Sequence, residues 1–229
     1  MALPVAPMAL PTADDDNGGQ FTTHHVVHTH VRGKALSVVY TKDPVSVESS
    51  IQTMEQFLAE DKYQVVGFDL EYTISCNGHD QKVVVAQLCV RHDVLVYHYY
   101  LATRPCEHFS RFIKSSDYSF ATVNTTNDLK ALKVSGLKCP NLVNIQHHYK
   151  VWGNDNNKLN SLFDLASAII DPYYMKMKDE SKKDMIAWHS VWHERLDEQH
   201  VKYAAKDAYT SYEMYRRIVD MRKCLVLAL

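Results

Sequence analysis

The stretch Val65-Val-Gly-Phe-Asp-Leu-Glu-Tyr72 decides how this chain of 229 residues is interpreted. Its first four residues are apolar at consecutive positions, which is typical of a strand that is covered on both faces of a sheet. Asp69 and Glu71 follow at positions i and i+2, and side chains at this spacing point to the same face of a strand. The sequence therefore predicts a central strand over Lys62–Thr73 that carries two neighbouring carboxylates near its end.

Two carboxylates side by side repel one another unless a cation binds between them. Oxygen ligands of this kind suit hard divalent cations such as Mg²⁺ and Mn²⁺. The alternative is a strand that ends in solvent, where acidic side chains cost little free energy. The pair Asp69 and Glu71 taken alone leaves both interpretations open.

The segments after this strand predict an α/β domain. Two more strands are expected over Lys82–Val90 and Val94–Leu101, and the short connections between the three strands favour an antiparallel arrangement. The elements expected after them are a helix over 107–115, a strand over 119–124, a helix over 127–135, a strand over 142–145, and helices over 159–170 and 197–226. We therefore expect a mixed sheet of about five strands that is flanked by helices.

The N-terminal part contains three different segments. Residues 1–20 carry several prolines and no basic residue before the apolar stretch, so we expect a disordered leader and no signal peptide. Residues 21–42 have the pattern of a β-hairpin with Gly33 in its turn, and residues 46–60 have the apolar spacing of an amphipathic helix. We expect residues 21–229 to form a single domain.

The composition is that of a folded globular protein, with 46% hydrophobic and 23% charged residues. The five cysteines are scattered without a Cys-x-x-Cys pair, which favours reduced thiols and a location in the nucleus or the cytoplasm. No apolar run approaches the roughly 18 residues of a membrane span, so no membrane association is expected. The 25 basic and 27 acidic residues give a net charge of −2, whereas nucleic-acid-binding proteins are usually basic.

Two later segments carry acidic residues at informative positions. Tyr203 and Asp207 lie at positions i and i+4 of the last predicted helix and share one of its faces. Ala204 and Ala205 between them are small enough to permit close packing against the sheet. Asp128 falls in the first turn of a predicted helix, where an acid is favourable to the helix dipole. For each motif by itself, a solvated acid on a helix is a sufficient explanation.

Taken together, the order and spacing of these residues resemble the DEDD superfamily of 3′→5′ exonucleases, in the subclass that carries a tyrosine. The resemblance is greatest to the exonuclease domain of the Werner-syndrome type and covers about residues 35–220. The motifs that carry it are Phe68-Asp-Leu-Glu71, Lys82-Val-Val-Val-Ala-Gln-Leu-Cys-Val90, Asp128-Leu-Lys-Ala-Leu132, Leu159-Asn-Ser-Leu162, Trp188 and Tyr203-Ala-Ala-Lys-Asp-Ala208.

This resemblance implies an RNase H-like fold and two divalent metal ions, Mg²⁺ or Mn²⁺. It implies that Asp69, Glu71 and Asp207 hold the first ion. It further implies that Asp69 also contacts the second ion, which Asp128 holds largely through water. In such a site one ion generates hydroxide near neutral pH and the other stabilises the leaving 3′-oxygen.

The resemblance also implies the reaction and the remaining site residues. Tyr203 would orient the attacking water, and Leu70 and Trp188 would contact the substrate. The substrate would be a nucleic acid with a 3′ end, either a single strand or a recessed duplex, and the products would be nucleoside 5′-monophosphates. A helicase or a repair protein would act in trans as a partner.

The sequence departs from this family at Ala121–Asn127, where the family has a glycine-rich turn. Asparagine tolerates the left-handed conformation that glycine would supply, so the turn can persist. Because no expected metal ligand is missing, we predict a metal-dependent 3′→5′ exonuclease. The alternative is a catalytically weak RNase H-like module for nucleic-acid binding or protein interaction, which the altered turn and the low net charge favour.

Overall fold

The computed structural model describes residues 19–29, 31, 33–73, 80–149, 161–180 and 191–227. The strands in these ranges are β1 (Thr22–His28), β2 (Ala35–Thr41), β3 (Val65–Tyr72), β4 (Val83–Val90), β5 (Asp93–Tyr97), β6 (Ser119–Thr122) and β7 (Leu142–Asn144). Over the described residues they form one seven-stranded sheet in the order β1-β2-β5-β4-β3-β6-β7.

The predicted α/β class is confirmed, but the expected number of about five strands was too low. β3, β4 and β5 form the predicted antiparallel meander, and β6 and β7 extend it with parallel pairing on the β3 side. The hairpin β1–β2 adds the other two strands, because β2 pairs in parallel with β5. Alternate residues of β2, namely Leu36, Val38 and Tyr40, are at most 2% exposed, so this strand is part of the core.

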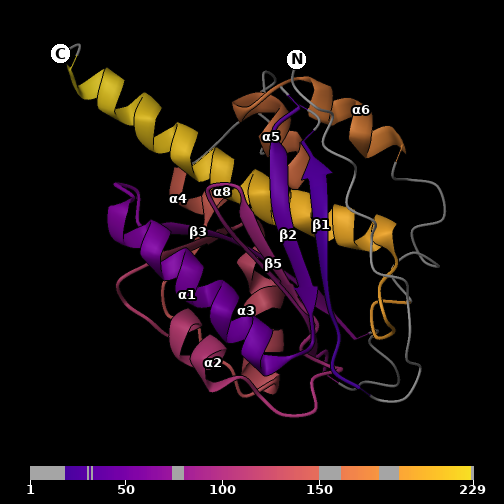
Figure 1. Cartoon of the computed structure of the whole chain (residues 1–229). Coiled ribbons are helices and arrows are strands. Elements are labelled where there is room, and N and C mark those ends of the chain that lie inside the picture. The colour runs from indigo at the N-terminus through magenta and orange to yellow at the C-terminus, as the bar shows by residue number, and fades with distance from the viewer. Residues whose placement is uncertain are drawn as a thin grey trace, which may run out of the picture.

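Helices cover both faces of the sheet. The helices on one face are α1 (Pro44–Glu60), α2 (Glu107–Ile113) and α3 (Thr125–Val134), and those on the other face are α4 (Ile145–Tyr149), α5 (Leu162–Ile169), α6 (Tyr173–Glu180) and α8 (Glu198–Leu227). Figure 1 shows the long helix α8 crossing the sheet, with α1, α2 and α3 on the opposite side.

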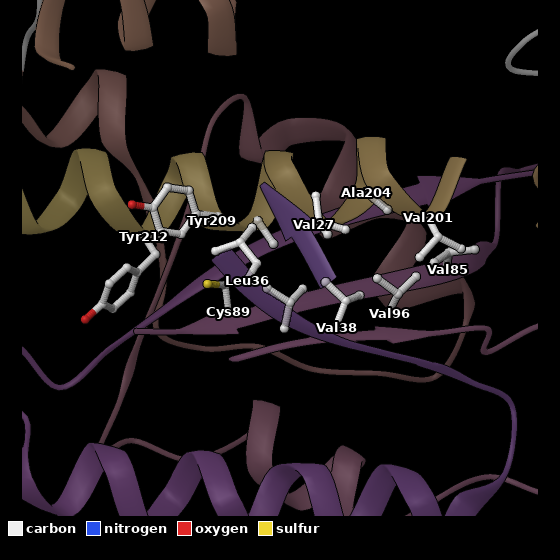
Figure 2. Close-up of a cluster of buried hydrophobic side chains, with 14 of the residues drawn as sticks. Val27, Leu36, Val38, Val85, Cys89, Val96, Val201, Ala204, Tyr209 and Tyr212 are labelled. Carbon is white, nitrogen blue, oxygen red and sulfur yellow. The ribbon is translucent and has the colours of Figure 1, made fainter. Parts of the chain in front are cut away.

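The alternation of residues along β3 separates two hydrophobic cores. Val66, Phe68 and Leu70 face the core beneath α1, α2 and α3, whereas Val65 faces the core beneath α8. Figure 2 shows side chains from β1, β2 and α8, among them Val27 and Ala204, that meet in this second core. Asp69 and Glu71 follow the parity of Val65 and therefore lie on the α8 side.

Some sequence-based expectations fall outside the described residues. Of the predicted leader, residues 1–20, the structure describes only Gly19 and Gln20. Trp188 also lies outside the described ranges, as does Leu159, the first residue of the helix expected over 159–170. Among the helices that the structure describes, none combines the length and the apolar character needed to cross a membrane.

Candidate active site

Gly67 sets the distance between the sheet and α8. A Cβ atom at this residue would lie 2.1 Å from the carbonyl oxygen of Ala208 and 2.7 Å from the Cβ atom of Tyr212. Only a residue without a side chain fits there. The close approach of the two backbones brings Asp207, the neighbour of Ala208 on α8, to the carboxylates of β3.

The predicted pair Tyr203 and Asp207 lies one turn apart on the sheet-facing side of α8. Ala204 and Ala205 between them are fully buried, and Asp207 itself is 6% exposed. The Tyr203 hydroxyl donates a hydrogen bond to the Asp207 carboxylate. The ring of Trp192 lies 6.1 Å from the Tyr203 ring and supports it from the segment before α8.

Asp128 reaches the site from the opposite helix layer. It lies in the first turn of α3 and is 3% exposed. The residue before this helix, Asn124, has φ +63°, so asparagine adopts the left-handed conformation that the altered turn requires. The Tyr72 hydroxyl donates a hydrogen bond to one oxygen of Asp128, and the Thr122 hydroxyl donates to the other at 3.4 Å.

The four carboxylates influence one another electrostatically. Burial raises the pKa of Asp69 to about 7. Burial, reinforced by the charge of Asp69, raises the pKa of Asp128 to about 8. Burial followed by the charges of Asp69 and Asp207 raises the pKa of Glu71 well above its usual value. The pKa of Asp207 is raised in the same way by burial and by Asp69. Each ionised carboxylate therefore makes ionisation of the others more costly.

Tyr203 is part of the same electrostatic cluster. The charge of Asp207 and burial, followed by the charges of Glu71 and Asp69, raise the pKa of its phenol. The phenol therefore keeps its proton at neutral pH, and it is a hydrogen-bond donor in this site.

Sequence reasoning gave no role to four residues that shape the site. Gln87 is fully buried and lies opposite Asp69 on β4, and its hydrogen bond to Glu71 opposes part of the rise in the pKa of Glu71. Gly67 had a signal in the sequence, since a glycine inside a strand often marks a close backbone approach. Tyr72 and Thr122 had none, because their contact with Asp128 joins segments far apart in the chain.

Leu70, which we expected to contact the substrate, is 3% exposed and lies in the core beneath α1, α2 and α3. Its contact with a substrate stays a prediction. The other expected substrate contact, Trp188, lies outside the described residues.

The donor set fits hard divalent cations in its chemistry. Across the described ranges, no three His, Cys, Asp or Glu side chains form a preformed metal centre. The site nevertheless gathers four carboxylates that are costly to ionise together, and a divalent cation would compensate their charge. The residues that could hold such an ion are Asp69, Glu71, Asp128 and Asp207.

A mixed sheet between two helix layers, with carboxylates gathered from β3, α3 and α8, defines an RNase H-like exonuclease fold. The family described as 3′-5′ exonuclease matches residues 44–222. The chain belongs to this family and is an exonuclease that acts from the 3′ end. No curated protein matches the chain.

Solved structures agree with this fold. The EXO domain of Nibbler from Aedes aegypti is 15% identical with a TM-score of 0.56, over 78% of this chain and 86% of that domain. RNase D from Trypanosoma brucei with GMP is 12% identical with a TM-score of 0.64, over 80% of this chain and 57% of that one. RNase D from Escherichia coli is 16% identical with a TM-score of 0.53, over 77% of this chain and 44% of that one. The chain thus spans about half the length of these two RNase D proteins.

Proposed function

We propose that this exonuclease hydrolyses phosphodiester bonds at the 3′ end of nucleic acid with two divalent ions, Mg²⁺ or Mn²⁺, and that it belongs to the tyrosine-bearing subclass. The observation that carries the proposal is the hydrogen bond of the Tyr203 hydroxyl to Asp207, beside the carboxylates of β3. The motifs at residues 68–71, 82–90 and 203–208 support a relationship to Werner-type exonuclease domains within this subclass.

The carboxylates divide into two groups in this proposal. Asp69, Glu71 and Asp207 would hold the first ion, and Asp69 together with Asp128 would hold the second. When bound, the ions would supply a hydroxide nucleophile and stabilise the charge on the leaving 3′-oxygen. Because the pKa of Tyr203 is raised, its phenol keeps its proton and donates a hydrogen bond. It would therefore orient the attacking water by donation.

The proposed substrate is nucleic acid with a free 3′ end, either a single strand or a recessed duplex. RNase D from Trypanosoma brucei has been crystallised with the RNA U12, and RNase D from Escherichia coli is described as an exoribonuclease in structured RNA processing. These relatives favour RNA as the first substrate to test. A helicase or repair protein acting in trans would open duplex regions.

The proposal is tested with single-stranded RNA and DNA oligonucleotides of one sequence, each labelled at the 5′ end, and with Mg²⁺, Mn²⁺ or a chelator. We expect a ladder of products shortened from the 3′ end, with release of nucleoside 5′-monophosphates, and no reaction in the chelator. The Asp207→Ala variant is the control for contaminating nucleases. Binding of the oligonucleotide without cleavage in either metal would instead support the alternative of a catalytically weak binding module.

The alternative module is favoured by one observation, the net charge of −2. The altered turn before α3 favours it less than the sequence suggested, because Asn124 takes the left-handed conformation there. The gathering of all four acidic residues opposes this alternative. Ionising four neighbouring carboxylates costs free energy, and a module without catalysis would gain nothing from that cost.

A further inference from the structure

We propose that Tyr72 is a positioning residue, which holds the Asp128 carboxylate in the orientation needed for the second divalent ion. This proposal rests on the proposed two-ion function. It assigns a role to a residue that would not itself touch the substrate or the reacting atoms.

The contacts of Asp128 carry the proposal. Asp128 is 3% exposed, so little water is available to hydrogen-bond its oxygens. Tyr72 donates to one oxygen and Thr122 donates to the other at 3.4 Å. Tyr72 and Thr122 therefore each hold one oxygen of the Asp128 carboxylate.

The alternation of side chains along β3 aims Tyr72 at this position, because Tyr72 lies two residues after Leu70 and shares its face of the sheet. Glu71 pairs with Val85 on β4, but the next residue, Tyr72, pairs with Val83, so Val84 has no direct partner on β3. The extra residue of this bulge therefore lies on β4, and Tyr72 keeps the face that Val66, Phe68 and Leu70 share on β3. Tyr72 consequently packs against the core beneath α1, α2 and α3 and reaches the first turn of α3.

The bridge between Tyr72 and Asp128 also connects the two helix layers of the site. Glu71 lies on the α8 side with Asp207, whereas Asp128 comes from α3 on the other side of the sheet. Because Tyr72 directly follows Glu71, its bond to Asp128 ties the position of one group of ligands to that of the other. Partners that hydrogen-bond a ligating carboxylate typically contribute 10- to 100-fold to metal affinity.

The test is calorimetric titration of the whole chain with Mn²⁺, without substrate. Wild-type protein is expected to bind Mn²⁺ at two sites, and Tyr72→Phe is expected to bind one of the two ions about 10- to 100-fold more weakly. Asp128→Asn is expected to lose the same binding event. The double variant should then be no worse than Asp128→Asn alone, because Tyr72 acts through Asp128.

Tyr99→Phe is the matched control, since Tyr99 also donates through its hydroxyl, to the carbonyl of Ser135 at 3.5 Å, away from the carboxylates. It should bind Mn²⁺ like the wild type. If Tyr72→Phe unfolds, Thr122→Val tests the same site and should weaken the same ion by a smaller factor. Unchanged Mn²⁺ affinity in folded Tyr72→Phe, or a further loss in the double variant, would overturn the proposal. If the folded wild-type protein bound no Mn²⁺ at all, whether or not it cleaved oligonucleotides, the proposed two-ion function itself would be overturned.

Discussion

The backbone of Gly67 on β3 and that of Ala208 on α8 approach so closely that a Cβ atom on Gly67 would lie 2.1 Å from the Ala208 carbonyl oxygen. This contact fixes α8 against the sheet next to the carboxylate pair. The position of Asp207 relative to Asp69 therefore depends on the absence of a side chain two residues before Asp69.

Gly67→Ala is expected to lower both stability and activity. The added methyl group meets backbone atoms, so α8 must shift, and overpacking of this kind costs about 1–3 kcal/mol or more. Thermal unfolding and exonuclease rates below the unfolding temperature measure the two effects. Gly136→Ala is the control, because its φ of +71° makes alanine strained while no atom lies within 4 Å of an added Cβ. Gly136→Ala should lose stability but keep activity per folded molecule, and full activity of Gly67→Ala would contradict this role of the close approach.

Asp207→Ala and Tyr203→Phe are expected to separate metal binding from water orientation. Asp207→Ala should abolish cleavage and weaken Mn²⁺ binding, because it removes a proposed ligand. Tyr203→Phe should bind Mn²⁺ normally and lose about 10²–10⁴-fold in rate, which is typical of one positioned catalytic group. Calorimetry and single-turnover kinetics measure these quantities. A fully active Tyr203→Phe would show that Tyr203 only packs against Trp192 and that the subclass is assigned incorrectly.

His98 is expected to make the fold sensitive to acid. It is fully buried, and burial lowers its pKa to about 4 from 6.5. The Tyr40 hydroxyl accepts a hydrogen bond from the backbone N–H of Leu196 at 2.8 Å. The same hydroxyl lies 3.0 Å from Nδ1 of His98, which fits a hydrogen bond donated by Tyr40 to a neutral imidazole. Between about pH 6.5 and 4 the unfolded chain binds this proton and the folded chain does not, so stability is lost as pH falls.

The loss that His98 causes should reach about 2 kcal/mol at about pH 5. Denaturant unfolding between about pH 7 and 5 measures it in the wild type and in His98→Gln, where the slope with pH should be smaller. His92→Gln, at an exposed histidine, is the control and should keep the wild-type slope. Equal slopes in all three proteins would show that His98 is not the group that titrates.

Without divalent ions, the carboxylate cluster is expected to affect the pH dependence of stability in the direction opposite to His98. The pKa values of Asp69 and Asp128 are raised to about 7 and about 8, so the folded state binds more protons than the unfolded state between about pH 4 and 8. In chelator, this cluster therefore contributes a loss of stability as pH rises through that range. Mn²⁺ favours the ionised forms and should raise the melting temperature more at about pH 8 than at about pH 5.5. Asp128→Asn should reduce that difference, and an equal effect of Mn²⁺ at both pH values would contradict the prediction.

Binding of single-stranded nucleic acid is expected to depend weakly on salt. With a net charge of −2, we expect only about two to four effective phosphate contacts. The logarithm of the affinity should then fall with the logarithm of the salt concentration with a slope of about −1.4 to −2.8. Fluorescence anisotropy with the Asp207→Ala variant, which leaves the oligonucleotide intact, measures this slope. A much steeper dependence would reveal an extensive basic surface.

The sequence by itself determined the central strand, the meander and the helical C-terminal part, because hydrophobic periodicity reports burial along each segment. It also placed Asp69 and Glu71 on one face of a strand, and Tyr203 and Asp207 on one face of a helix, since both spacings are properties of local geometry. The hairpin was recognised as a hairpin, but its membership of the sheet depends on the pairing of β2 with β5, which no local pattern encodes.

Only the tertiary structure decided how these pieces meet. The hydrogen bond from Tyr72 to Asp128 joins residues 56 positions apart, and the contact of Gly67 with Ala208 joins two elements that are still further apart in the sequence. The raised pKa values have the same origin, because desolvation and the repulsion among carboxylates arise only when β3, α3 and α8 pack together. The sequence supplied the acids, and the packing of distant elements turned them into one electrostatic cluster.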